Sequence, residues 1–134
     1  MKLTTYSDGG ARGNPGPMGI GYVVYSEAGQ VLKQAGEYIG EGTNNHAEYK
    51  AVTAALNAAH SLGAAKVECL LDSELVVKQL QGKYKIREQN LQGLAADVLR
   101  LVKSFESVEF THIRREKNKL ADQLVNEALD AAGF

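Results

Sequence analysis

The sequence predicts an α/β domain in which an antiparallel hairpin leads into a parallel sheet. Two β-rich runs near the N-terminus are joined by a short turn, and beyond them helical patterns alternate with short apolar strands. The resulting order of elements is βββαβα(α)βα. The 134 residues suit one domain spanning 1–134, because this length supports one hydrophobic core and is too short for a second.

The first strand is expected to end at Asp8, where the glycine-rich stretch DGGARGNPGP begins. A glycine-rich loop after a strand can bind phosphate, but Pro15 and Pro17 interrupt this segment and no nucleotide-binding pattern fits it. Residues 19–39 instead predict two strands joined at 27–30 as a hairpin. On its own, Asp8 fits a turn-initiating aspartate in front of two glycines.

The run from Thr43 to Gly63 has the pattern of a helix. Asn45 is the expected cap, Glu48 follows three residues later as in a capping box, and Gly63 is the expected stop. Alanines recur at helical spacing, and such small side chains allow a helix to lie close to a sheet.

Strands and helices alternate in the second half of the chain. Residues 66–72 predict a short apolar strand that ends at Asp72, and Ser73 is placed to cap a helix over 74–82. The remaining elements are expected to be a helix at 91–105, a strand at 107–113 and a helix at 118–133. The inner stripe expected of the last helix consists of Leu120, Leu124, Val125 and Ala128.

Composition restricts the setting of the protein. Cys69 is the single cysteine, which excludes an internal disulfide and fits a reducing compartment. The start MKLTTYSDGG lacks an apolar signal core, and no run approaches the ~20 apolar residues of a membrane span. We therefore expect a cytoplasmic protein with no membrane partner, and a monomer by default.

The charge distribution allows contact with nucleic acid at restricted places. The formal net charge of −1 argues against a uniformly basic surface. Residues 78–87 nevertheless hold four positive side chains and no acid, and residues 114–119 hold four with Glu116 alone opposing them. Such clusters follow a phosphate backbone in some proteins and are solvated faces in others, and both interpretations remain open here.

Four acids fall at the ends of predicted elements. Asp8 and Asp72 close strands, whereas Glu48 lies in the first turn of a helix and Asp122 near the start of the last one. Each acid has a local explanation as a turn residue, a capping-box residue or a partner of the helix dipole. If the four ends converge, their like charges require a compensating cation, and Mg²⁺ is a hard divalent ion that binds carboxylate and phosphate oxygens.

Four blocks of the sequence resemble, in order, the signature blocks of the type 1 ribonuclease H family. They are DGGARGNPGPMGIGYVV, TNNHAEYKAVTAAL, LDSELVVKQL and REKNKLADQLVNEAL, and they extend over nearly the whole chain. Each block contains one of the four acids, so the combination is far more specific than any single block. The resemblance implies the ribonuclease H-like fold, a mixed five-stranded sheet in the order 3-2-1-4-5 with helices on both faces.

The family resemblance also implies an activity and a cofactor. It implies an endonuclease that cuts the RNA strand of RNA–DNA hybrids largely without sequence preference, leaving a 5′-phosphate and a 3′-hydroxyl. Double-stranded RNA is a further candidate substrate. It implies two Mg²⁺ ions, for which Mn²⁺ can substitute. In that arrangement Asp8 bridges both ions, Glu48 and Asp72 complete one ion, and Asp122 completes the other.

The resemblance places nucleic-acid contacts near the glycine-rich stretch. Its glycines would let the backbone approach the minor groove of the hybrid, where ribose 2′-hydroxyls are displayed. Turn and cap chemistry is the alternative role of the residues that match the family's contact positions. These residues are Asn14, Thr43, Asn44 and Asn45.

The sequence departs from the family in three places. First, only GKYKIREQN stands where many bacterial members carry a basic protrusion, so Lys83, Lys85 and Arg87 are the remaining candidates for gripping the hybrid and weaker binding is expected. Second, Glu74 stands where the family often has Gln. Its carboxylate either repels a backbone phosphate or adds to the field around the metal ions.

The third departure is a short loop before the last acid, at the place where bacterial members carry a general-acid/base histidine. His112 lies ten residues before Asp122 and matches that histidine by count. Alternation with Phe110 along the last strand instead places His112 within the strand, as a packed residue, and leaves Arg115 nearest the metal ions. We expect Arg115 to make the catalytic contact and keep His112 as the alternative.

Two other functions remain open on the sequence. A catalytically silent module would bind hybrids or double-stranded RNA with the same surface, but its mark would be a missing acid and all four are present. A structural α/β domain would use the acids as caps and turns, which requires four coincidences in register with the four blocks.

Overall fold

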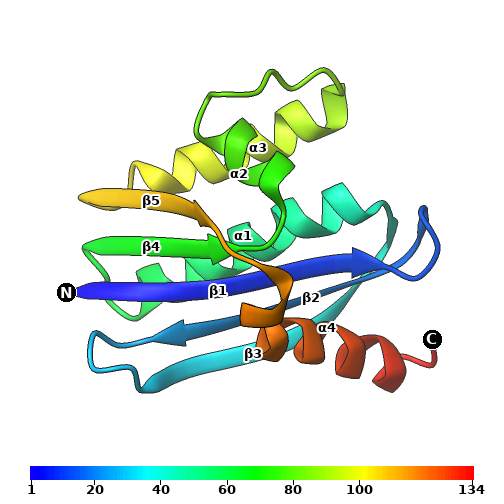
Figure 1. Cartoon of the computed structure of the whole chain (residues 1–134), viewed down its shortest axis with the longest axis horizontal. Coiled ribbons are helices and arrows are strands. Elements are labelled where there is room, and N and C mark those ends of the chain that lie inside the picture. Colours follow the sequence, from blue (N-terminus) through cyan, green and yellow to red (C-terminus); the bar gives the residue numbers. More distant parts are fainter.

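The computed structural model describes residues 1–134 and has five strands and four α-helices. In chain order the elements are β1 Lys2–Ala11, β2 Gly16–Tyr25, β3 Val31–Gly42, α1 Asn44–Ser61, β4 Lys66–Leu71, α2 Glu74–Leu80, α3 Gln89–Val102, β5 Ser107–His112, a 3₁₀ turn Arg115–Lys117 and α4 Lys119–Ala131. The strands form one mixed sheet in the order β3-β2-β1-β4-β5 (Figure 1). β1 to β3 pair antiparallel, while β1, β4 and β5 pair parallel. The predicted fold class and strand order are confirmed.

Helices cover both faces of the sheet. Along β2, Tyr22 and Val24 belong to the apolar cluster shared with α1, α2 and α3. Gly19 and Gly21 alternate with them and face α4 on the opposite side. The helix that carries Asp122 therefore lies across the sheet from the helix that carries Glu48.

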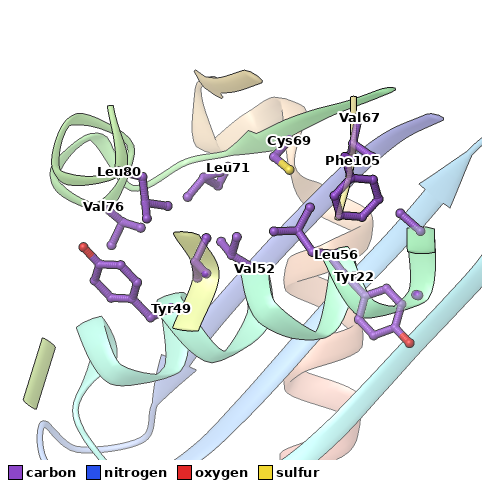
Figure 2. Close-up of a cluster of buried hydrophobic side chains, with 14 of the residues drawn as sticks. Tyr22, Tyr49, Val52, Leu56, Val67, Cys69, Leu71, Val76, Leu80 and Phe105 are labelled. Atoms are coloured by element: carbon purple, nitrogen blue, oxygen red, sulfur yellow. The ribbon is translucent and has the colours of Figure 1, made fainter. Parts of the chain in front are cut away.

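The main core lies between the sheet and α1, α2 and α3 (Figure 2). Twenty buried residues form one cluster there. This cluster holds α1 against β1 and β4, so the elements that carry Asp8, Glu48 and Asp72 are fixed by a single apolar interior. Its side chains include Tyr49, Val52 and Leu56 from α1, Val67, Cys69 and Leu71 from β4, and Val76 and Leu80 from α2.

Glycines allow α4 to lie unusually close to the sheet. A Cβ on Gly21 would come within 2.4 Å of the carbonyl oxygen of Ala121, and one on Gly36 within 2.4 Å of that of Leu124. Any other residue at these positions would push the helix outward. The repeated glycines of β2 and β3 thus set the distance between α4 and the sheet.

The buried stripe of α4 differs from the predicted one. Ala121, Val125 and Leu129 are buried. Because the glycines bring the helix backbone so close to the sheet, these three side chains fill the contact between α4 and the sheet. The residues beside them on the helix lie at the edge of that contact. Val125 is confirmed as an inner residue, whereas the half-buried ones are Leu120, Leu124 and Ala128.

β1 continues to Ala11, so the prediction that the strand ends at Asp8 is wrong. On one side the antiparallel pairing with β2 continues as far as Ala11 opposite Met18. On the other side the parallel pairing with β4 ends at Ser7 opposite Leu71. Asp8 is the first residue of β1 beyond the place where the sheet divides, and it does not initiate a turn.

The cap of α1 is Thr43, so the prediction of Asn45 is wrong. The Thr43 side chain accepts a hydrogen bond from the backbone nitrogen of His46 at 3.2 Å, and its backbone is extended as a cap requires. Asn45 is already helical. Glu48 lies beyond the first turn and completes no capping box, which leaves its carboxylate free for another role.

The predicted hairpin turn, helix stop and helix cap agree with the structure, whereas α3 spans Gln89–Val102 and not 91–105, and the hairpin strands extend beyond 19–39 to Gly16 and Gly42. Residues 26–30 join β2 and β3, and Gly63 follows α1 with a φ of 86°, which favours glycine. Ser73 caps α2 by accepting a hydrogen bond from the backbone nitrogen of Val76 at 3.3 Å. No helix has both the length and the apolar character that crossing a membrane demands.

Candidate active site

Asp8 and Asp72 lie side by side at one end of the sheet. Ser7 is paired with Leu71, and each acid is the next residue along its own strand or just beyond it. β1 and β4 diverge here, since β1 continues toward β2 whereas the chain leaves β4 for α2. In α/β sheets, ligands bind in such crevices beyond the carboxyl ends of parallel strands.

Gly9 brings Glu48 to the same place. A Cβ on Gly9 would lie 2.3 Å from the carbonyl oxygen of Ala47, so only glycine lets α1 approach β1 this closely. The Gly9 backbone nitrogen donates to Glu48 Oε1 at 3.5 Å. The glycine behind Asp8 thus serves internal packing and places the second carboxylate.

The three carboxylates form a compact cluster. One oxygen each from Asp8, Glu48 and Asp72 lie within 4.8 Å of one another. Burial, and after it the charge of Asp72, raise the pKa of Asp8 to about 7. Burial, followed by the charge of Asp8, raises the pKa of Glu48 well above its usual value. A negative charge on Asp8 or on Glu48 is therefore costly in the absence of a cation.

Asp122 approaches this cluster from the other face of the sheet. It lies in the first turn of α4, and it contributes to the raised pKa of Asp8 by both hydrogen bonding and charge. All four predicted acids line one pocket of about 360 Å³. Besides them, the pocket is lined by Gly9, Gly10, Ala11, Arg12, Asn44, Asn45, Ser73, Arg115, Val125, Asn126 and Leu129.

The cluster fits a hard divalent cation. Its donors are carboxylate oxygens, which such ions prefer, and they lie close enough to share one ion. Glu48 Oε2 is buried and has no hydrogen-bond partner. A buried acceptor left without a partner costs free energy, and a bound cation would both satisfy it and offset the repulsion between the acids.

Asn118 is a buried residue of the site that the sequence reasoning missed. It is 1% exposed, and its Nδ2 donates to the carbonyl oxygen of Ser7 at 2.8 Å and to Asp72 Oδ2 at 3.1 Å. One amide thus joins β1 at the place where its pairing with β4 ends, the acid after β4 and the start of α4. An asparagine before a helix has the pattern of a simple cap, so no sequence signal distinguished this role.

The predicted nucleic-acid residues near the glycine-rich stretch are brought together. Asn14 Oδ1 accepts a hydrogen bond from the Asn44 nitrogen at 3.0 Å, and Asn44 Oδ1 accepts one from the Ala11 nitrogen at 2.8 Å. Asn44 and Asn45 line the acid pocket, whereas Asn14 and Thr43 lie outside it. These hydrogen bonds lock the β1–β2 loop to the start of α1 and leave polar side chains exposed around the pocket.

The other predicted nucleic-acid residues do not line the acid pocket. Glu74 is exposed in the first turn of α2. Lys83, Lys85 and Arg87 are exposed on the connection between α2 and α3. Any contact they make with a ligand would lie beyond the acid pocket.

Arg115 lines the acid pocket and His112 does not. His112 is the last residue of β5, as the alternation of the strand predicted, and it pairs with Leu71. The expectation that His112 is a packed residue is wrong, because it ends an edge strand and its side chain is exposed. Arg115 and Arg12 are thus the two cationic side chains that line the pocket with the four acids.

Known proteins share this architecture. A family model described as reverse transcriptase-like matches residues 6–128. The crystal structure of RNase H1 from the archaeon Halobacterium salinarum is 40% identical, with a TM-score of 0.96 over 98% of this chain and 99% of that chain. LC11 RNase H1, solved in complex with an RNA/DNA hybrid, is 46% identical, with a TM-score of 0.93 over 97% of this chain and 98% of that chain.

A curated relative is much longer than this chain. The bifunctional protein of Mycobacterium tuberculosis is 41% identical over 98% of this chain, and the chain spans 36% of that relative's length.

A mixed sheet in the order β3-β2-β1-β4-β5, with clustered acids where β1 and β4 diverge, defines the ribonuclease H-like class. Within that class, the chain belongs to the type 1 ribonuclease H family, since it matches RNase H1 structures over nearly the full length of both chains. The predicted family is confirmed.

Proposed function

We propose that the chain, acting as a single domain over 1–134, is an endonuclease that hydrolyses the RNA strand of RNA–DNA hybrids. The proposed products carry a 5′-phosphate and a 3′-hydroxyl. The observation that carries this proposal is the convergence of Asp8, Glu48, Asp72 and Asp122 in one pocket. It is supported by the similarity to LC11 RNase H1, which was solved with an RNA/DNA hybrid bound.

Two Mg²⁺ ions are the proposed cofactors, with Mn²⁺ as a substitute. Asp8 is proposed to bind both ions, Glu48 and Asp72 to complete one, and Asp122 to complete the other. Such ions, when bound, supply an activated water and stabilise the leaving alkoxide. Asp8 and Glu48 must be ionised to bind them, and their raised pKa values mean that binding near neutral pH releases protons.

Other side chains of the pocket are proposed to hold and orient the substrate. Arg115 carries a permanent charge and is exposed at the pocket, where it can bind the scissile phosphate. Asn44 and Asn45 offer amide groups to 2′-hydroxyl and phosphate oxygens. Since ribose and phosphate carry no base code, cutting should be largely independent of sequence.

The proposed setting is the cytoplasm, with the protein acting as a monomer. Cys69 is buried and unpaired, and burial raises the pKa of its thiol to about 12, so it stays a protonated core residue. Double-stranded RNA is proposed as a secondary substrate, because it shares the A-form shape and the 2′-hydroxyls of the hybrid's RNA strand.

The test is cleavage of a fluorescently labelled RNA–DNA hybrid in Mg²⁺, beside double-stranded RNA and double-stranded DNA. We expect cleavage of the RNA strand of the hybrid and none of double-stranded DNA. Asp8→Asn should remove nearly all cleavage of the hybrid, because the change deletes the carboxylate shared by both ions and leaves a side chain of nearly the same shape. Asp97→Asn makes the same chemical change on the surface of α3 and should leave turnover unchanged.

Near-normal turnover of Asp8→Asn in Mg²⁺ would refute the two-metal arrangement. A wild-type protein that binds the hybrid without cutting it would instead identify a silent binding module. Absence of both binding and cutting would leave the acids with purely structural roles.

A further inference from the structure

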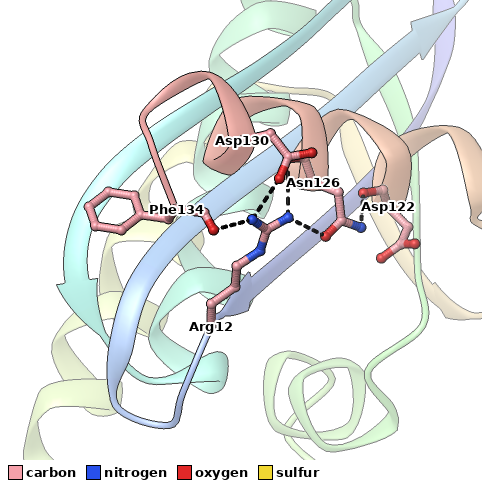
Figure 3. A network of polar contacts seen from close by, with 5 residues as sticks. All are labelled: Arg12, Asp122, Asn126, Asp130 and Phe134. Atoms are coloured by element: carbon pink, nitrogen blue, oxygen red, sulfur yellow. Dashed lines mark hydrogen bonds and ion pairs between the residues drawn. The ribbon is translucent and has the colours of Figure 1, made fainter.

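Arg12 connects the glycine-rich loop to α4 and to the residues that follow it (Figure 3). Its Nη1 donates to Asp130 Oδ1 at 2.7 Å and to the carbonyl oxygen of Phe134 at 2.6 Å. Its Nη2 donates to the carbonyl oxygen of Asn126 at 3.4 Å and to Asn126 Oδ1 at 3.2 Å. One guanidinium thus occupies four acceptors, a number that only the fork of arginine can reach.

The contacts of Arg12 lead to Asp122. Asp122, Asn126 and Asp130 are spaced by four residues, so they lie along one edge of α4. The Asn126 Nδ2, on the side chain that Arg12 holds, donates to the carbonyl oxygen of Asp122 at 3.1 Å. Arg12 and Asn126 both line the acid pocket. A continuous chain of hydrogen bonds therefore runs from the β1–β2 loop to the turn of α4 that carries the fourth acid.

The packing of α4 on the sheet also bears on the position of Asp122. The glycines of β2 and β3 set how closely α4 approaches the sheet. Glycines have no side chains to interlock with the ridges of a helix, so at Gly19, Gly21 and Gly36 the sheet resists sliding of α4 along its axis less than side chains would. Asn118 holds the start of α4 at the sheet through its hydrogen bond to Ser7, and Arg12 binds the second half of α4 through Asn126.

The ion pair between Arg12 and Asp130 explains little folding stability. The Arg12 and Asp130 side chains are 33% and 68% exposed, and ion pairs as exposed as these contribute little to folding. Arg12 is placed on the loop that follows Asp8, and it reaches the helix that carries the acid opposite Asp8. The hydrogen bonds of Arg12 thus link the strand that carries Asp8 to the helix that carries Asp122, and both acids are candidate metal ligands.

We propose that Arg12 is a positioning residue that fixes α4 along its axis and so holds Asp122 opposite Asp8 for metal binding. The inference rests on the proposed function, because it concerns the ion that Asp122 completes. Arg12 acts through Asn126 and the helix and does not touch the reacting atoms.

The first measurement is Mn²⁺ binding by isothermal titration calorimetry in the absence of nucleic acid. Arg12→Ala should weaken one binding event by about 10-fold, the low end of the losses seen when residues that orient metal ligands are removed. Arg12→Lys keeps the charge but loses the fork, and should give an intermediate loss. Arg100→Ala, which removes an arginine paired with Asp97 on the surface of α3, is the matched control.

The second measurement is the Mg²⁺ dependence of hybrid cleavage. Arg12→Ala should raise the half-activating Mg²⁺ concentration by about 10-fold, while turnover at saturating Mg²⁺ and KM for the hybrid stay within about two-fold. In an Asp122→Asn background, Arg12→Ala should cause no further loss of Mn²⁺ affinity, since both changes affect one site.

The outcomes separate this inference from the proposed function. If wild type neither binds Mn²⁺ nor cuts the hybrid, both fall together. If wild type does both and Arg12→Ala binds Mn²⁺ equally well, only the positioning role is wrong. In that case a raised KM assigns Arg12 to direct hybrid contact, and a lowered melting temperature assigns it to stability. If Arg12→Ala does not fold, the same comparison is made with Arg12→Lys.

Discussion

At the scale of single residues, the surroundings of Asp8 and Glu48 disfavour the ionised form of both carboxyl groups. Burial and the neighbouring acids raise the pKa of Asp8 to about 7 and that of Glu48 well above its usual value. Without a cation, the folded protein relieves this repulsion by keeping protons that the unfolded chain releases. Proton binding and metal binding therefore compete for the same oxygens.

The competition predicts an unusual pH dependence of stability in EDTA. Because the folded pKa of Asp8 is about 7 against an ordinary 3.8, its protonation stabilises the fold fully below about 3.8, and this contribution is lost as pH rises through about 7. We expect the melting temperature of wild type, followed by circular dichroism, to fall over this range relative to that of Asp8→Asn. Saturating Mg²⁺ should restore it at the upper end.

Neutralising one acid should likewise hold or raise the melting temperature of the metal-free protein near neutral pH. The comparison is made with Asp8→Asn and Asp72→Asn in EDTA. A clear loss of stability in both variants would instead favour structural roles for these acids.

The second residue prediction concerns Arg115 and His112. Arg115→Ala should lower turnover about ten-fold, or about 1.4 kcal/mol of barrier, with little change in melting temperature. His112 is exposed and outside the acid pocket, so His112→Ala should change stability by less than about 0.5 kcal/mol and leave turnover nearly unchanged. Turnover is measured on the labelled hybrid across a pH series.

The pH series provides the decisive control for that pair. If His112 is not a proton shuttle, the pH profile of the rate near the ordinary histidine pKa of ~6.5 should be the same in wild type and in His112→Ala. Reduced turnover in His112→Ala at unchanged melting temperature, together with a difference between the two profiles near that pKa, would restore His112 as the proton shuttle.

At the scale of elements, close backbone approach decides where the site lies. Gly9 lets α1 approach β1, and Gly21 and Gly36 let α4 approach the sheet, so helices from both faces place acids beside Asp8 where β1 and β4 diverge. The sequence predicted the elements and the four acids, because periodicity and local motifs report them. It could not predict which glycine faces which helix, since that depends on the pairing register of strands distant in sequence.

The same limit explains the errors at α1. Thr43 and Asn45 are both good capping residues, and local preference did not distinguish them. The tertiary contact at Gly9 fixes where α1 lies and directs Glu48 toward Asp8. Asn118 was missed for a similar reason, because its partners Ser7 and Asp72 are far away in the sequence.

Gly9→Ala tests the role of close approach. The added Cβ would lie 2.3 Å from the carbonyl oxygen of Ala47, so α1 must shift and the core beneath it loosens. We expect a loss of about 1–3 kcal/mol in the free energy of unfolding, measured with urea, together with reduced turnover as Glu48 moves. For the free energy of unfolding, Gly10→Ala is the matched control, because its Cβ would meet nothing closer than Asn44 Oδ1 at 3.8 Å. Equal losses of unfolding free energy in both variants would argue against a specific contact at Gly9.

At the scale of the whole molecule, charge is distributed unevenly about a net value of −1. The pocket concentrates four acids, while the exposed cations of the α2–α3 connection lie outside it. A polyanionic substrate must therefore reach the acids while being held mainly elsewhere. Phosphate contacts made by those cations would supply the holding force, and they would be sensitive to salt.

The salt dependence of hybrid binding measures how many such phosphate interactions exist. Removing one of them should reduce the slope of log K against log salt by roughly 0.7–0.9. A variant with Lys83, Lys85 and Arg87 all changed to Ala should therefore bind more weakly at low salt and show a shallower slope than wild type. Fluorescence anisotropy in EDTA measures this binding without cleavage. Lys33→Ala, on exposed β3, provides a control for the removal of one positive charge. If the triple variant keeps the wild-type slope, the basic connection does not touch the hybrid, and substrate holding would fall to residues around the pocket such as Arg115.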